Sequence, residues 1–319
     1  MSQHDHHYAY YPGCSLGATA RSYEVSLQRV AERLGLTLHE VDDWNCCGAT
    51  EYFSLNSLPA YSLVARNLSL AAEQGLPDLV APCSACYLNL HKTDKYMKQY
   101  ADLNAKVNQA LAAGGLHYDP GTLRVRHLLD VIVEDVGYEA LAAHVQQSLR
   151  GLRVAPYYGC LIVRPDSDYN PEYPTHLDRL LQTLGATVVD FPLKTHCCGG
   201  HMTQISEDTA YELIRRILHA ASEYQADLIV TVCPMCQLNL DAYQSQVNRR
   251  FGTAYNLPVL FFTQLIGLAM GLAAEEVGIG SEIVSAHEAL AKIGRGVEPP
   301  TYAPKRRDKS ALPMPPALP

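Results

Sequence analysis

The chain lacks a long uninterrupted run of apolar residues. Its most apolar stretch, from Leu257 to Ala274, is broken by proline, threonine, glutamine and glycine. Crossing a bilayer takes roughly 18 apolar residues in a row, so no transmembrane segment is expected. The polar beginning, from Met1 to His7, has no apolar core of an export signal, which predicts a cytoplasmic location.

An excess of basic side chains is also lacking. The formal net charge is −8, whereas a nucleic-acid surface needs clustered cations that displace counterions from phosphates. No nucleic-acid partner is therefore expected. The chain has no flavin or nicotinamide fingerprint and no ordinary ferredoxin spacing, C-x2-C-x2-C-x3-C. Electrons used in any redox chemistry must therefore come from or go to a partner protein.

Cysteine, in contrast, is abundant, with 10 in 319 residues. The cytosol keeps thiols reduced, so metal or redox chemistry explains these cysteines better than disulfides do. They fall into two sets of the same order, C-x31-CC-x35-C-x2-C and C-x36-CC-x34-C-x2-C. The first pentad is Cys14, Cys46, Cys47, Cys83 and Cys86, and the second pentad is Cys160, Cys197, Cys198, Cys233 and Cys236.

The residues around the two pentads match as well. Glycine precedes Cys14 and Cys160, the adjacent cysteines are followed by glycine in both sets, and both C-x2-C groups run into Leu-Asn-Leu. Corresponding cysteines lie 146 to 151 positions apart, which indicates an internal duplication. We predict one domain over residues 1–150 and a second over 151–296. Residues 297–319 are rich in proline, which predicts an extended arm that docks on a partner or stays disordered.

Each half alternates short apolar strands with amphipathic helices, a pattern typical of a parallel α/β layer. The predicted strands are 7–11, 37–41 and 78–81, then 153–157, 187–191 and 227–232. The predicted helices are 20–34, 59–74 and one from 88 onward, then 175–184, 208–224 and 238–250. Every cysteine group follows the end of a predicted strand, where α/β sheets gather their ligand-binding loops. Three loops per half are therefore expected to converge on one site.

Five thiols per site are one more than a tetrahedral zinc ion binds. Adjacent cysteines can bind neighbouring irons of an extended cluster, so the donor set favours iron–sulfur, while zinc in one or both sites remains an alternative. A thioredoxin-like role for either C-x2-C group would leave three cysteines per half unused. Glycines beside the cysteines are expected to let the backbone approach an inorganic core or simply to turn the chain. These are Gly13, Gly48, Gly159, Gly199 and Gly200.

The doubled pattern resembles the CCG-domain proteins, most closely the B-type subunit of heterodisulfide reductase and its bacterial sulfur-oxidising relatives, over about residues 8 to 295. The resemblance implies two pseudo-symmetric CCG domains with one noncubane 4Fe-4S cluster bound by each pentad. It further implies that a disulfide is cleaved or formed between the clusters, with a small disulfide or a lipoyl-carrier sulfur species as substrate. The implied partners are a small ferredoxin-like subunit with two ordinary 4Fe-4S clusters and a flavin-bearing subunit docked to it.

Four further side chains lie near the second pentad in the sequence. His196 and His201 flank its adjacent cysteines and are candidates for proton transfer or for hydrogen bonding to the metal ligands. Lys194 and Arg164 could meet an anionic substrate, but solvated surface charge is the stronger expectation for both. Two other functions stay open: a CCG electron-transfer subunit of a succinate, glycolate or lactate oxidising complex, and a zinc-binding scaffold.

Overall fold

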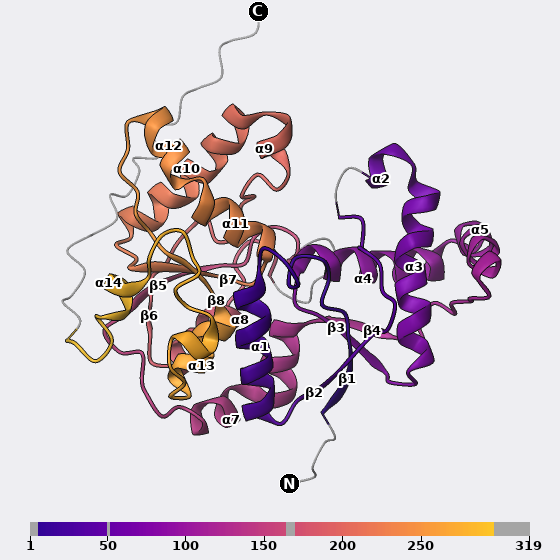
Figure 1. The fold of residues 1–319 in the computed structure, drawn as a ribbon, viewed down its shortest axis with the longest axis horizontal. Helices are drawn as coiled ribbons and strands as arrows, with labels where there is room; N and C mark the ends of the chain where they lie inside the picture. Colours follow the sequence, from indigo (N-terminus) through magenta and orange to yellow (C-terminus); the bar gives the residue numbers. More distant parts are fainter. Residues whose placement is uncertain (1–5, 50–51, 164–169, 297–319) are drawn as a thin grey trace, which may run out of the picture.

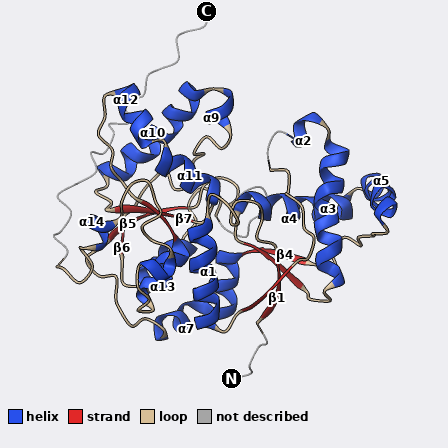
Figure 2. Ribbon diagram, in the orientation of Figure 1, coloured by secondary structure: helices blue, strands red, loops and turns tan. Residues whose placement is uncertain are grey.

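The computed structural model describes residues 6–49, 52–163 and 170–296. Two α/β halves lie next to each other, and each contains one sheet flanked by helices (Figures 1 and 2). Arg164 and the arm predicted at 297–319 lie outside the described residues. The domain boundaries themselves stay predictions.

The first half contains a four-stranded parallel sheet in the order β2-β1-β3-β4. Its strands are β1 (His7–Tyr10), β2 (Thr37–Glu40), β3 (Asp78–Ala81) and β4 (Arg124–His127). Its helices are α1 (Arg21–Leu34), α2 (Tyr52–Leu55), α3 (Ser57–Glu73), α4 (Ser84–Gln99), α5 (Ala101–Leu111), the short η1 (Ala112–Gly114), α6 (Leu128–Asp130), the π-helix η2 (Val131–Val136) and α7 (Gly137–Ala143).

The second half repeats this topology in the order β6-β5-β7-β8, again parallel throughout. Its strands are β5 (Arg153–Tyr157), β6 (Thr187–Val188), β7 (Leu228–Thr231) and β8 (Val259–Phe261). Its helices are α8 (His176–Thr183), α9 (Met202–Ile205), α10 (Glu207–Glu223), α11 (Pro234–Ala242), α12 (Gln244–Phe251), α13 (Phe262–Ala269), the short η3 (Glu275–Val277) and α14 (His287–Leu290). The predicted duplicated α/β fold is confirmed.

Several features differ from the sequence-based expectation. The strand expected over 187–191 ends at Val188, and the helix expected over 238–250 is divided into α11 and α12. The fourth strand of each sheet, β4 and β8, was not predicted; β4 reads as polar because it carries two arginines and a histidine. The helices expected from 88 and 238 begin earlier, at Ser84 and Pro234. Cys83 and Cys233 have extended backbone just before these helices, and proline is favourable in the first helical turn. Cys86 and Cys236 therefore lie on a first helical turn rather than in a loop.

The two halves share their hydrophobic core. Helix α1 has an apolar stripe at helical spacing that includes Tyr23, Leu27 and Val30, and this stripe is buried. The helix packs against α13 of the other half, and the Tyr23 ring stacks on Phe261 at the end of β8 with centroids 4.3 Å apart. Ser26 Oγ on α1 lies 2.7 Å from Thr263 Oγ1 on α13. This contact fixes the carboxyl ends of the two sheets relative to each other.

Candidate metal centre

The first pentad gathers beyond the carboxyl ends of β1, β2 and β3. Cys46 Sγ lies 3.8 Å from Cys14 Sγ, and Cys47 Sγ lies 3.3 Å from Cys86 Sγ. Cys83 completes the group, since its thiol lies close enough to Cys86 for each to shift the pKa of the other. Three separate segments of the chain thus bring five free thiols into contact.

The second pentad gathers in the same way beyond β5, β6 and β7. All five of its cysteines line one cavity of about 40 Å³, together with Tyr158 and Ser84. Cys198 Sγ lies 3.6 Å from Cys236 Sγ, and Cys160 lies close enough to Cys197 for that thiol to raise its pKa. The remaining lining residues are Leu161, Gly200 and Met235.

Two pairs of equivalent side chains hold the adjacent cysteines in place. The hydroxyl of Tyr11 donates to the Asn45 carbonyl at 2.7 Å, and that of Tyr157 donates to the His196 carbonyl at 2.6 Å. The amide of Asn89 donates to the Cys47 carbonyl at 3.0 Å, as the amide of Asn239 donates to that of Cys198 at 3.2 Å. The two asparagines were missed as site residues, although the repeated Leu-Asn-Leu after each C-x2-C group was a signal for them.

Glycine is required next to the first cysteine of each pentad. Gly13 has a φ of +73°, and a Cβ there would lie 2.8 Å from Cys86 Sγ. Gly159 has a φ of +69°, and its Cβ would lie 2.9 Å from Cys236 Sγ. Other side chains would be strained at both positions and would collide with sulfur.

The two pentads meet at the centre of the molecule. The Cys83 and Cys233 thiols lie close enough for each to shift the pKa of the other, upward for Cys83 and downward for Cys233, which joins the first pentad to the second. Ser84, which follows Cys83, lines the cavity of the second pentad. The ten thiols therefore form one continuous site built from both halves.

The site opens to solvent at Cys14, Cys46 and Cys197, which are exposed. Hydrogen bonding from Cys14 lowers the pKa of the Cys46 thiol to about 2. Hydrogen bonding from Cys160 lowers the pKa of the Cys197 thiol to about 6, and the Gly199 N–H donates to Cys197 Sγ at 3.3 Å. The first member of each adjacent pair thus favours the thiolate, which is the metal-binding form of cysteine.

Lys194 is not a solvated surface charge, and this expectation was wrong. Its side chain is buried, and its Nζ lies 2.9 Å from Asp178 Oδ1 and 3.8 Å from the centroid of the Tyr173 ring. Asp178 also accepts a hydrogen bond from the hydroxyl of Tyr158 at 2.5 Å. A carboxylate and an aromatic face compensate the ammonium for its lost hydration. Through Asp178, Lys194 therefore holds Tyr158 in the wall of the second cavity.

The two candidate histidines lie beside the adjacent cysteines of the second pentad. His196 is exposed and His201 is half-buried just before α9, and proton transfer by either stays a prediction. A third histidine, His127 at the end of β4, is fully buried. Its Nε2 lies 3.4 Å from Ser84 Oγ, and burial lowers its pKa to about 4. Sequence reasoning missed His127 because no cysteine is near it in the chain.

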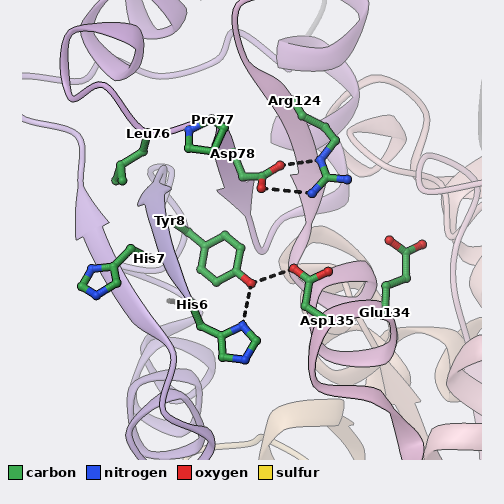
Figure 3. A pocket seen from close by; sticks show the side chains of 9 residues that line it. All are labelled: His6, His7, Tyr8, Leu76, Pro77, Asp78, Arg124, Glu134 and Asp135. Carbon is green, nitrogen blue, oxygen red and sulfur yellow. Dashed lines mark hydrogen bonds and ion pairs between the residues drawn. The ribbon is translucent and has the colours of Figure 1, made fainter. Parts of the chain in front are cut away.

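A cavity of about 740 Å³ lies at the opposite, amino-terminal edge of the first sheet (Figure 3). Asp78 binds Arg124 there through two contacts of 2.5 and 3.0 Å, and Tyr8 donates to Asp135 at 2.7 Å. These polar groups bind one another and lie at the other end of the strands from the pentads. The cavity lining is His6, His7, Tyr8, Leu76, Pro77, Asp78, Arg124, Glu134 and Asp135.

The pentads fit a sulfur-ligated cluster better than a single ion. Over residues 6–49, 52–163 and 170–296, no three His, Cys, Asp or Glu side chains are arranged so that they could hold a metal ion. Each pentad nevertheless offers five free thiols, beside a glycine whose missing Cβ leaves the sulfur accessible. Such a donor set suits an iron–sulfur group, which is bound by thiolates.

Comparison with known families agrees with the doubled motif. The cysteine-rich domain called CCG matches residues 8–91 and again 154–241. The chain therefore belongs to the CCG cysteine-rich domain family, as its sequence predicted.

Similar proteins include subunits of two kinds of reductase. The 8-methylmenaquinol:fumarate reductase membrane anchor subunit of Wolinella succinogenes is 36% identical over 88% of this chain and 97% of the relative. The B-type subunit of the ferredoxin:CoB-CoM heterodisulfide reductase of Methanosarcina mazei is 31% identical over 88% of this chain and 95% of the relative. The predicted resemblance to this heterodisulfide reductase subunit is confirmed.

A solved structure of a hypothetical protein from Helicobacter pylori shares the fold. Its TM-score is 0.73 at 14% identity, over 88% of this chain and 52% of that chain. In the part of the chain that the structure describes, no helix is both long and apolar enough to cross a membrane.

Proposed function

We propose that the chain is the iron–sulfur subunit of a heterodisulfide-reductase-like complex. Each pentad binds one noncubane 4Fe-4S cluster, and a disulfide is cleaved or formed between the two clusters. The observation that carries this proposal is the contact between Cys83 and Cys233, which joins the pentads into one site. Similarity to the B-type subunit of heterodisulfide reductase supports the same reaction class.

A duplicated site suits disulfide chemistry. A disulfide has two equivalent sulfurs, and its reduction takes up two electrons and two protons to give two thiols. Bound clusters would supply single-electron transfer and iron that accepts sulfur. The chain's own residues hold and orient the site. Tyr11 and Tyr157 do so through hydrogen bonds to the carbonyl that precedes each pair of adjacent cysteines. His201 and His196 are the proposed proton carriers at the mouth.

The proposed complex contains two further subunits. A small protein with two ordinary 4Fe-4S clusters would exchange electrons with this chain, and a flavin-bearing subunit would in turn serve that protein. The support is the lack of a flavin or nicotinamide fingerprint in the sequence, together with relatives named as subunits. The arm at residues 297–319 is the proposed docking segment, and the cytoplasm is the proposed location.

One relative favours a second candidate function. The fumarate reductase subunit of Wolinella succinogenes belongs, by its name, to an enzyme that uses a menaquinol. The chain would then transfer electrons between a quinone and a complex that oxidises or reduces a small acid, without a disulfide substrate. A zinc-binding scaffold is the third alternative.

Metal analysis tests the cluster assignment directly. Full-length protein purified without oxygen is expected to contain about eight iron and eight sulfide per chain, with an EPR signal from each site. Cys83→Ser and Cys233→Ser should each remove about half of the iron. Stoichiometric zinc in place of iron would overturn the proposal.

Activity of the reconstituted complex separates the two redox functions. Reduction of a lipoyl carrier protein or of a small disulfide is expected, and the faster of these identifies the substrate class. Turnover with a menaquinol analogue and none with any disulfide would establish the second candidate instead.

A further inference from the structure

An apolar cavity of about 500 Å³ lies in the first half, between α3 and the end of α5 (Figure 1). Small-molecule sites measure roughly 300–1,000 Å³ and are mostly apolar, with a few polar groups that fix the ligand. This cavity has that composition, because leucines form most of its wall and one arginine, Arg66, lies in it. The leucines are Leu58, Leu63, Leu111 and Leu116.

The polar side of the cavity adjoins the first pentad. Arg66 Nη1 lies 3.2 Å from Asn45 Oδ1. Tyr52, another lining residue, has its ring 3.7 Å from the place that a Cβ would take on Gly48. Asn45 and Gly48 stand directly before and directly after the adjacent cysteines of the first pentad. A molecule in the cavity is therefore separated from this pentad by single residues of the chain.

The internal duplication provides a comparison within the same molecule. Helices α3 and α10 occupy equivalent places, since both are 17 residues long and follow the adjacent cysteines of their half. Leu63 and Arg66 of α3 recur as Leu213 and Arg216 of α10. The same helix face can therefore be examined in both halves.

In the second half this face is closed by charge. Leu58 and Ser62 are replaced there by Asp208 and Glu212. Asp208 Oδ1 lies 3.0 Å from Nη2 of Arg250 on α12, and Glu212 pairs with two arginines of its own helix. The fold therefore does not require an apolar cavity at this place, and the first half has one because of its own side chains.

Arg66 offers donors with little uncompensated charge. Among the residues that the structure describes, its guanidinium binds Asp43 twice and Asn45 once, which engages three of its five N–H groups. The carboxylate of Asp43 already neutralises it. The remaining donors suit a neutral acceptor such as a carbonyl oxygen, whereas an anionic group would compete with Asp43.

A quinone with an isoprenoid tail has the complementary chemistry. Its ring is flat and apolar, its carbonyl oxygens accept hydrogen bonds, and its tail is apolar. We propose that the cavity binds the ring of such a quinone, with Arg66 donating to a ring carbonyl and the leucines packing against the ring and the tail.

The inference rests on the second candidate function for its purpose, since that function exchanges electrons with a quinone. The cavity is formed by α2, α3 and the end of α5, away from the junction of Cys83 and Cys233. Binding of a quinone is therefore independent of a disulfide reaction at that junction.

The probe is a dimethylnaphthoquinone in which both thiol-reactive ring positions carry methyl groups, because the chain has exposed cysteines. Dimethylnaphthalene has the same ring system without the oxygens. Decanoate has an apolar tail and an anionic head. Comparison of the three separates a quinone site from a merely apolar one and from a fatty-acid site.

The main variant copies the second half onto the first. Leu58→Asp with Ser62→Glu places two carboxylates in the cavity wall, at positions where α10 carries the same residues. The fold should tolerate it, since an acidic residue is favourable in the first turn of a helix. Ala105→Asp with Gln109→Glu is the matched control, because both positions are exposed on α5 and outside the lining.

Equilibrium dialysis of the full chain, purified without oxygen, measures the affinities. Wild type and the α5 control should bind one equivalent of the quinone, and the α3 double variant should bind it at least about tenfold more weakly, because binding would desolvate carboxylates. Arg66→Met should weaken quinone binding about tenfold and leave dimethylnaphthalene unaffected. Absence of saturable quinone binding, equal affinity in the α3 variant, or tighter binding of decanoate would each overturn the proposal.

Trp44 gives a second, local measurement. It stands between Asp43 and Asn45, the two residues that Arg66 binds, and it is the single tryptophan. The quinone should quench its fluorescence saturably in wild type and the α5 control, at the concentrations that dialysis gives. Quenching that does not saturate in wild type contradicts the proposed position.

Far-UV circular dichroism checks that each variant is folded. If the α3 double variant is not, Arg66→Met decides alone: weaker quinone binding supports the proposal and unchanged binding rejects it. Failure to bind the quinone leaves the iron content, and so the cluster assignment, untouched. Absence of iron from the wild type would refute the proposed function but leave the binding result valid.

Discussion

At the scale of single residues, Gly13 and Gly159 leave no room for a side chain beside sulfur. Both have positive φ, and both lie directly before the first cysteine of a pentad. The repeated close contact with Cys86 and Cys236 shows that the duplication preserved a backbone requirement as well as a set of thiols.

We expect Gly13→Ala to remove the cluster of the first pentad and Gly159→Ala that of the second. The added Cβ would lie under 3 Å from sulfur in each case, so the sulfur must move from its binding position. Iron per chain should fall by about half in either variant. Gly35→Ala is the matched control, because Gly35 has a φ of +69° but nothing within 4 Å of a Cβ. Full iron content in Gly13→Ala would contradict this account.

The buried pair of Lys194 and Asp178 leads to a prediction about stability. Removing one partner leaves an uncompensated buried charge, so Lys194→Met should lower the free energy of unfolding by about 3–5 kcal/mol. Lys106→Met breaks an exposed pair with Asp102 and should cost less than about 1 kcal/mol. Urea denaturation measures both. Equal small effects would show that Lys194 is solvated in solution.

At the scale of elements, the first three strands of each sheet were predictable, whereas the fourth strand of each sheet and the starts of the two helices after the C-x2-C groups were not. The strands β1, β3, β5 and β7 are mostly buried and, after a polar first residue in β1, β3 and β5, largely apolar, so their pattern is visible in the sequence. Strand β4 was not predicted, because its polar residues Arg126 and His127 are buried. Their burial depends on specific ion-pair and hydrogen-bond partners, which leave no periodic pattern in the sequence. The burial of Lys194 was not predicted for the same reason, since its partner Asp178 lies in a different element.

The junction of β4 with the π-helix η2 is held by charge. Arg126 is buried, and its Nη2 lies 2.7 Å from Glu134 Oε2 while its Nη1 lies 2.5 Å from Asp135 Oδ2. Asp135 also accepts a hydrogen bond from the hydroxyl of Tyr8. Burial alone would raise the pKa of Asp135, but the bonds from Arg126 and Tyr8 outweigh it and the pKa is lowered. The ionised carboxylate is therefore the form that stabilises the fold.

The lowered pKa of Asp135 predicts how stability depends on pH. Because the folded pKa of Asp135 is below its unfolded value of about 4, its contribution is complete above that pH and is lost as pH falls through the folded pKa. Asp135→Asn should be less stable than wild type at pH 7, and the difference should shrink below about pH 4. Urea denaturation between pH 7 and pH 3 gives both curves. Parallel curves would exclude Asp135 as the titrating group.

At the scale of the whole molecule, the site depends on how the halves pack. Repeat spacing indicated which cysteines form each pentad, and the structure brings these thiols together. The repeat spacing could not indicate that Cys83 lies near Cys233, because that contact depends on the packing of α1 against α13. The sequence contains no local signal for a contact between residues so far apart in the chain.

We expect the two halves to unfold as one cooperative unit. Both hydrophobic clusters contain residues from each half, and Phe261 of the second half stacks on Tyr23 of the first. Phe261→Ala should therefore destabilise the whole chain, by about 3–5 kcal/mol. The single tryptophan, Trp44, lies in the first half and reports on that half by its fluorescence.

The fluorescence of Trp44 and the far-UV circular dichroism of the whole chain should lose their native values at the same urea concentration. In Phe261→Ala both transitions should shift equally, although the substitution lies in the other half. Phe251→Ala, at a partly exposed position on α12, is the control and should shift neither transition much. An unshifted Trp44 transition in Phe261→Ala would mean that the halves are independent, and a site shared by both could then not owe its geometry to their packing.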